Sequence, residues 1–128
     1  MPTWMLWLLT GAILWFLYKK FKSGKNAMFQ NLGNDAFSEK MKNADHVVLD
    51  VRTDAEYASG HLPKAKLINV MDASFSSKVD ALDKSKTYLV YCRSGSRSRG
   101  ACEIMASRGF QVFNLDNGIM GWNGPVER

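Results

Sequence analysis

Four short runs of β-branched and other apolar residues constrain the fold of this chain more than any other feature. Each has the length of a buried strand, and they occupy residues 46–51, 67–70, 88–91 and 112–115. Segments of helical character begin at Asn34 and lie between the runs, at about residues 54–59, 72–82 and 98–108. This alternation predicts an α/β fold with a mainly parallel central sheet and helices on both faces.

The first 18 residues contain no charged side chain and include three of the four tryptophans. As a helix they would span about 27 Å, close to the hydrocarbon core of a bilayer. We therefore expect one transmembrane helix over residues 1–18, preceding the folded domain. A cleaved signal peptide and an apolar packing helix are the alternatives. A signal peptide would carry its positive charge before the apolar run, and here the charge follows it.

Residues 19–29 are expected to be a basic juxtamembrane linker. Four of the 17 basic residues lie between positions 19 and 25, ahead of all 12 acidic residues. Lysines of this kind stay on the cytoplasmic side, which predicts a single-pass membrane protein whose helix contacts the lipid bilayer. Its N-terminus would lie outside and its domain, residues 30–128, on the cytoplasmic side. Contact of the lysines with anionic lipid headgroups is one alternative; a solvated run that only sets topology is the more common one. The chain beyond the linker is left with a charge of about +1, so it lacks the basic face that a nucleic-acid partner requires.

The most informative segment is the loop that follows the run ending at Tyr91. Cys92 opens it, and small residues in the loop would let successive backbone N–H groups turn inward as an anion-binding nest. The expected binding residues are Arg93, Ser94, Gly95, Ser96 and Arg97. A helix N-terminus and nearby cations lower the pKa of a thiol, so Cys92 is expected to be a thiolate nucleophile. The two cysteines and two histidines lack the spacing of a metal site or a disulfide framework, so no metal is expected.

At these residues the chain resembles the rhodanese family of sulfurtransferases. The resemblance covers about residues 30–128, and its motifs lie at 49–52, 56–57, 60–62, Ala65, Asn69, 91–95, 97–98, 109–110 and 118–122. It implies that Cys92 takes a sulfane sulfur from a small anionic donor such as thiosulfate. The sulfur would be held as a covalent persulfide, without a cofactor, and passed to a thiol, to cyanide or to a protein acceptor. Arg93 and Arg97 would contact the anion.

Two other functions remain open at this point. One is a redox or regulatory binding module that uses a reactive cysteine without turnover. The other is an arsenate reductase or phosphatase of the same fold. In those enzymes five residues separate the cysteine from the arginine, whereas four separate Cys92 from Arg97 here, which favours sulfur transfer.

Asp50 and Arg52 lie where a predicted strand ends, on the side where ligands bind in α/β sheets. We interpret them as an ion-paired brace that supports the Cys92 loop, with a direct catalytic role as the alternative. Glu56 and His61 are expected to be architectural. Cys102 is expected to be a small core residue, although a role in accepting sulfur from Cys92 is open.

Overall fold

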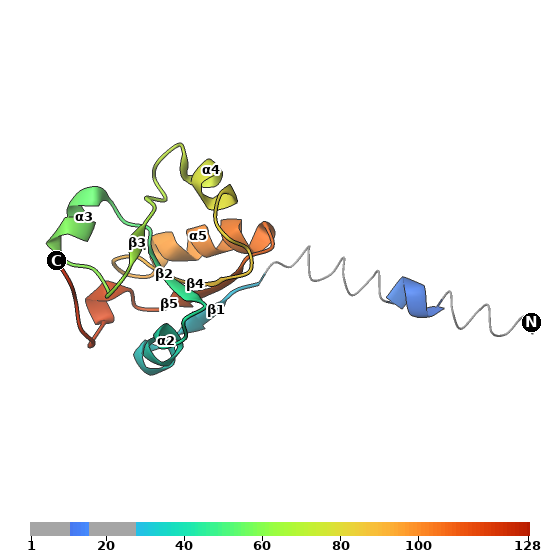
Figure 1. Ribbon diagram of the computed structural model, residues 1–128, viewed down its shortest axis with the longest axis horizontal. Helices are drawn as coiled ribbons and strands as arrows, with labels where there is room; N and C mark the ends of the chain where they lie inside the picture. Colours follow the sequence, from blue (N-terminus) through green and yellow to red (C-terminus); the bar gives the residue numbers. More distant parts are fainter. Residues whose placement is uncertain (1–10, 16–27) are drawn as a thin grey trace, which may run out of the picture.

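The computed structural model describes residues 11–15 and 28–128 of the chain. From residue 28 onward, strands and helices alternate along the sequence (Figure 1). In chain order the elements are β1 (Gln30–Leu32), α2 (Asn34–Met41), β2 (His46–Asp50), α3 (Asp54–Ser59), β3 (Lys66–Leu67), α4 (Phe75–Asp80), β4 (Thr87–Tyr91), α5 (Ser96–Ser107), β5 (Gln111–Leu115) and the 3-10 helix η1 (Ile119–Gly121).

The strands form one sheet in the order β1-β5-β4-β2-β3, and every neighbouring pair is parallel. The predicted parallel α/β sheet is confirmed. In a parallel sheet the carboxyl ends of all strands lie at the same edge, which is where such folds bind ligands. Strand β4 lies at the centre, and the residue that follows it is Cys92.

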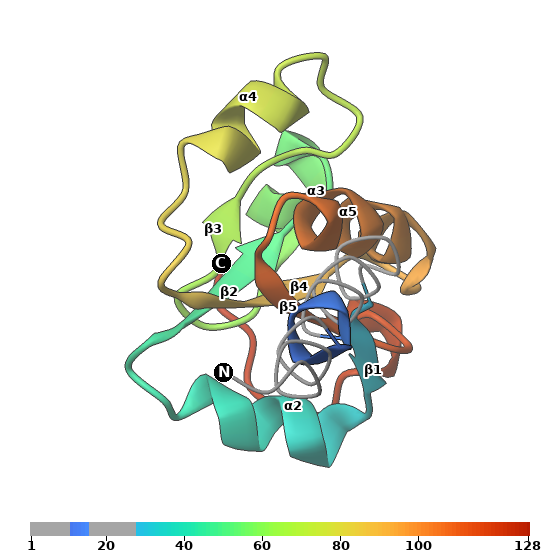
Figure 2. The ribbon, with the colours of Figure 1, turned by 90° about the vertical axis from the view of Figure 1, so that its right-hand side faces the viewer.

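Side chains of the central strand alternate between the two faces of the sheet, as a pleated strand requires. Tyr88 and Val90 belong to a core shared with α4 and α5. Leu89 and Tyr91 belong to a second core, which includes Phe37 of α2. Figure 2 shows α2 on one side of the sheet and α4 and α5 on the other. Helices on both faces are therefore confirmed, and β4 is buried from both directions.

Strand β1 departs from the sequence expectation, because Gln30–Leu32 carries none of the β-branched residues that marked the other strands. It is an edge strand paired only with β5, so backbone hydrogen bonding rather than burial defines it. Strand β3 is shorter than predicted, with two residues, and α4 is confined to Phe75–Asp80. Helix α5 begins at Ser96, two residues earlier than expected.

Most of the predicted transmembrane helix of residues 1–18, and nearly all of the linker of residues 19–29, lie outside the described residues. Residues 11–15 are helical, and the side chains of Ile13, Leu14 and Trp15 are exposed. Among residues 11–15 and 28–128, no helix has both the length and the apolar composition needed to cross a bilayer.

Candidate active site

The Cys92 loop connects β4 to α5, and the 3-10 helix η1 fixes its backbone. The amide of Ile119 donates to the carbonyl of Cys92 at 2.9 Å, and the amide of Met120 donates to the carbonyl of Arg93 at 3.0 Å. In a trans peptide the carbonyl of one residue and the N–H of the next point in opposite directions. Holding these two carbonyls against η1 therefore turns the following amides, those of Arg93 and Ser94, away from η1.

The Cys92 sulfur is the acceptor of several hydrogen bonds. The amide of Gly95 donates to Sγ at 3.1 Å, and the Ser98 hydroxyl lies 3.3 Å from it. Burial of Cys92 raises the thiol pKa, but hydrogen bonds from the Ser98 hydroxyl and from the amides of Ser98, Gly95 and Ser94 outweigh burial. The pKa of Cys92 therefore lies below its ordinary value, as expected for a nucleophile at a helix N-terminus.

Two glycines allow the loop to pack closely against the turn that follows β5. Gly95 has φ +98°, and a Cβ there would collide with the Asp116 carbonyl oxygen. Gly118 has φ +61°, and a Cβ there would collide with the carbonyl of Arg93. Both positions therefore require glycine for conformation and for space. This close packing fixes the direction of the Gly95 N–H.

The carbonyl of Gly95 is held as firmly as its amide. It accepts hydrogen bonds from the Arg99 amide at 3.2 Å, the Ser98 hydroxyl at 3.1 Å and the Asn114 amide group at 3.4 Å. Asn114 is fully buried and also donates to Oδ1 of Asn31 at 2.9 Å. A series of hydrogen bonds thus runs from Asn31 of the edge strand β1 through Asn114 to Gly95, the residue whose amide donates to the sulfur. The sequence analysis assigned no role to Ser98 or Asn114. Asn114 could have been noticed, because it is a polar residue within the otherwise apolar stretch of β5.

Asp50 and Arg52 form a buried ion pair at the end of β2, next to Tyr91. Arg52 donates to Asp50 from Nη2 at 2.7 Å and from Nε at 3.0 Å, and it also donates to the carbonyl of Gly60 at 2.6 Å. The Tyr91 hydroxyl donates to Asp50 at 2.6 Å and accepts from the Leu62 amide at 3.0 Å. The pair thus ties β2 and the segment after α3 to the residue that immediately precedes Cys92.

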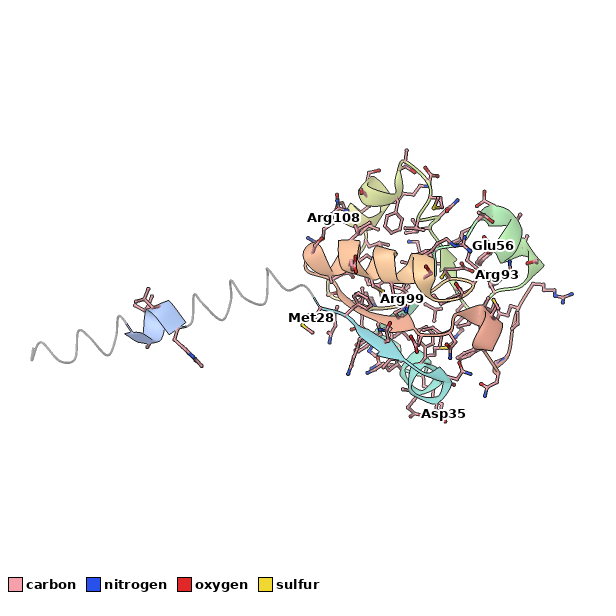
Figure 3. The ribbon with its side chains drawn as sticks, turned by 180° about the vertical axis from the view of Figure 1, so that it is seen from behind. Met28, Asp35, Glu56, Arg93, Arg99 and Arg108 are labelled. Carbon is pink, nitrogen blue, oxygen red and sulfur yellow. The ribbon has the colours of Figure 1, made fainter. Side chains whose placement is uncertain are left out.

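The arginines of the loop and of the first turn of α5 differ in their partners. Arg97, expected as an anion contact, bonds with both terminal nitrogens to the carboxylate of Glu56. Arg99 lies 4.0 Å from Asp116. The Arg93 side chain is exposed, and no described residue forms an ion pair or a hydrogen bond with it. Figure 3 shows Glu56 and Arg93 on the same side of the domain, beside the N-terminal end of α5.

The remaining predicted residues occupy different environments. Ser94 and Ser96 are exposed, so their side chains border the loop on the solvent side, whereas Cys92 is buried. His61 stacks on Tyr57 with a ring separation of 3.9 Å. Cys102 lies in the core between α5 and the sheet, and burial raises its pKa to about 12. Over residues 11–15 and 28–128, no three acidic, histidine or cysteine side chains are grouped to hold a metal ion.

Comparisons with known proteins show the family to which the chain is similar. The family model for the rhodanese-like domain matches residues 34–125. YtwF of Bacillus subtilis is 36% identical over 99 residues, which is 77% of this chain and 94% of that protein. A sulfurtransferase of Allochromatium vinosum is 31% identical over 97 residues, covering 74% of this chain and 89% of that one. The thiosulfate sulfurtransferase GlpE of Pseudomonas fluorescens is 32% identical over 87 residues, which is 66% of this chain and 77% of that protein.

Solved structures show the same fold. A rhodanese-related protein from Thermoplasma volcanium superposes with a TM-score of 0.70 at 26% identity, covering 77% of this chain and 98% of that one. A rhodanese-like domain protein from Staphylococcus aureus gives a TM-score of 0.69 at 27% identity, covering 77% of this chain and 97% of that one.

Proposed function

The chain belongs to the rhodanese-like domain family, and we propose that it transfers sulfane sulfur through a persulfide on Cys92. The relatives that carry the name sulfurtransferase support sulfur transfer in general. The observation that carries the specific proposal is the set of hydrogen bonds to one sulfur atom. Gly95 and Ser98 donate to Cys92 Sγ at 3.1 and 3.3 Å and lower its pKa.

In the first half-reaction the Cys92 thiolate attacks the sulfane sulfur of the donor. With thiosulfate, a new S–S bond forms to Cys92, the S–S bond of thiosulfate breaks, and sulfite leaves with the electron pair. The product is an anionic persulfide. Donors in the loop then stabilise its charge in the way that an oxyanion hole stabilises a developing anion.

In the second half-reaction an acceptor thiolate, or cyanide, attacks the terminal sulfur of the persulfide. The bond between the two sulfurs breaks, and Cys92 leaves as a thiolate, which the same hydrogen bonds stabilise. The proposed cycle needs no cofactor, because the enzyme carries the sulfur covalently. Separate half-reactions predict ping-pong kinetics.

The test is the mass of the purified full-length chain after incubation with thiosulfate. We expect a gain of about 32 Da on Cys92, corresponding to one added sulfur. The gain should be absent in Cys92→Ser and should disappear when cyanide is added, with release of thiocyanate. A chain that alkylating reagents modify at Cys92 but that never acquires sulfur would be a redox or regulatory module instead. Release of phosphate from an aryl phosphate would favour the phosphatase alternative.

We also propose that residues 1–18 anchor the protein as a single-pass helix with the catalytic domain on the cytoplasmic side. The support is the uncharged N-terminal sequence followed by lysines. Fractionation of cells tests the proposal: the full chain should remain with membranes after alkaline extraction, and a chain starting at residue 28 should be released. Protease added outside intact cells should leave the domain undigested.

A further inference from the structure

The ion pair between Arg97 and Glu56 assigns a role in substrate choice to a residue outside the Cys92 loop. Nη1 of Arg97 lies 2.8 Å from Oε1 of Glu56, and Nη2 lies 2.9 Å from Oε2. A two-point contact of this kind uses one N–H group of each terminal nitrogen of Arg97 and offsets the charge of the guanidinium. The two side chains are 30% and 28% exposed, so water screens the pair only in part.

Glu56 is held on α3 independently of Arg97. The Thr53 hydroxyl donates to Oε1 of Glu56 at 3.1 Å, and the Glu56 amide donates back to that hydroxyl at 3.3 Å, which forms a capping box. The hydrogen bond from Arg97 lowers the pKa of Glu56 to about 2, more than offsetting its partial burial. The carboxylate is therefore fixed in place and charged throughout the physiological pH range.

Arg97 is the neighbour of Ser98, whose hydroxyl lies 3.3 Å from Cys92 Sγ, so the Arg97–Glu56 pair lies beside the loop that holds the sulfur. The thiolate also contributes to the raised pKa of the Arg97 guanidinium, after the larger effect of Glu56. Since Arg99 also faces a carboxylate, that of Asp116, Arg93 is the one loop arginine without a carboxylate partner among the described residues. The site offers a donor much less positive charge than three arginines suggest.

From this geometry we propose that Glu56 is a specificity-determining residue, which neutralises Arg97 and shifts the selectivity of the site away from dianionic and toward singly charged sulfur donors. The preferred donor class is a persulfide or another monoanion with a terminal sulfur. This inference rests on the proposed sulfur transfer. Coulomb energy scales with ligand charge, so a neutralised Arg97 costs a dianion twice what it costs a monoanion.

Two small donors isolate the effect of charge. Thiosulfate is a dianion and methanethiosulfonate is a monoanion. Each transfers its terminal sulfur to Cys92 when one S–S bond breaks, releasing sulfite or methanesulfinate. The measurement is kcat/KM for each donor with cyanide as acceptor, in wild type and in Glu56→Gln. Glutamine is accepted in a capping box, so the variant removes the charge and keeps an oxygen for Thr53.

We expect Glu56→Gln to raise kcat/KM for thiosulfate about tenfold, mainly through KM, since one charge-assisted hydrogen bond becomes available to the anion. The gain for methanethiosulfonate should be about threefold, because its charge is half as large. Both gains should shrink as salt is added. Glu39→Gln is the matched control. Glu39 forms an exposed ion pair with Lys42, far from the site in sequence, so the variant should leave kcat/KM unchanged for both donors.

A double variant tests the proposal without depending on Glu56→Gln alone. Adding Arg97→Gln to Glu56→Gln should abolish the gain in thiosulfate kcat/KM that Glu56→Gln alone produces, because no unpaired guanidinium is then left to contact the anion. A gain that persists without Arg97 would mean that Glu56 does not act through Arg97 and would overturn the proposal. An unchanged ratio of thiosulfate to methanethiosulfonate in an active Glu56→Gln enzyme would also overturn it. Failure of the proposed function itself would be distinct, because wild type would then acquire sulfur from neither donor.

Discussion

Replacing Ser98 with alanine tests how the protein keeps Cys92 ionised. The hydroxyl lies 3.3 Å from Sγ and 3.1 Å from the carbonyl oxygen of Gly95, and its single proton cannot serve both acceptors fully. A hydrogen bond to a charged group contributes about 1.5–3 kcal/mol, and the shared proton places this one at the lower end. Since about 1.36 kcal/mol corresponds to one pKa unit, Ser98→Ala should raise the pKa of Cys92 by about one unit.

The effect should be confined to ionisation. The Gly95 carbonyl keeps hydrogen bonds from the Arg99 amide and from Asn114 when the hydroxyl is removed. Alanine leaves little empty volume and is a good helix former, so the free energy of unfolding should change by less than about 1 kcal/mol.

The assay is the rate of Cys92 alkylation as a function of pH. The Ser98→Ala profile should follow the wild-type profile displaced to higher pH by about one unit, with the two rates converging at alkaline pH. Ser107→Ala is the matched control on the same helix, since the Ser107 hydroxyl donates to the carbonyl of Ile104, far along α5 from the loop. Superimposable profiles for Ser98→Ala and wild type would refute the assignment of Ser98 as a thiolate donor.

Other perturbations follow from the same geometry. Gly95→Ala should abolish persulfide formation and lower the free energy of unfolding by more than about 1 kcal/mol, because it places a Cβ at φ +98° against Asp116. Gly100→Ala, in open space on the same helix, should raise that free energy by up to about 1 kcal/mol in denaturant titrations. The depressed pKa of Glu56 predicts acid destabilisation: its contribution is complete above pH 4.5 and is lost as the pH falls toward about 2. In Glu56→Gln this contribution to the fall in the free energy of unfolding at acid pH should be absent, as measured by circular dichroism. Cys102→Ser should retain turnover with thiosulfate and cyanide, since the Cys102 thiol is buried in the core; a drop of tenfold or more would assign it a part in the reaction.

The sequence predicted the parts of the fold that local pattern controls. Helix α3 was predicted with its observed bounds, Asp54–Ser59, and a capping box begins it. Strand β4 was predicted to within one residue, because both of its faces are buried and its sequence is almost wholly apolar. Strand β1 was not predicted as a strand, because its pairing with β5 comes from the far end of the chain.

In the candidate site, too, the part built from consecutive residues was predicted and the part built from distant elements was not. Cys92 and its loop were identified from consecutive residues, since small residues before a helix form an anion-binding turn. The partners of that loop come from other elements. Glu56 approaches from α3 and Asn114 from β5, and no spacing rule along the chain connects either of them to Cys92. The sequence predicted Arg93 and Arg97 as contacts for an anion, and only the packed structure shows that the Glu56 carboxylate offsets Arg97.

The pairing of β1 also orders the events of biosynthesis. Asn31 and Asn114 meet in the finished sheet although 83 positions separate them. A chain emerging from the ribosome therefore holds β1 unpaired until β5 has been made, and no intermediate stage of synthesis can complete the sheet. The residues that precede β1 therefore leave the ribosome before the sheet they adjoin can be completed.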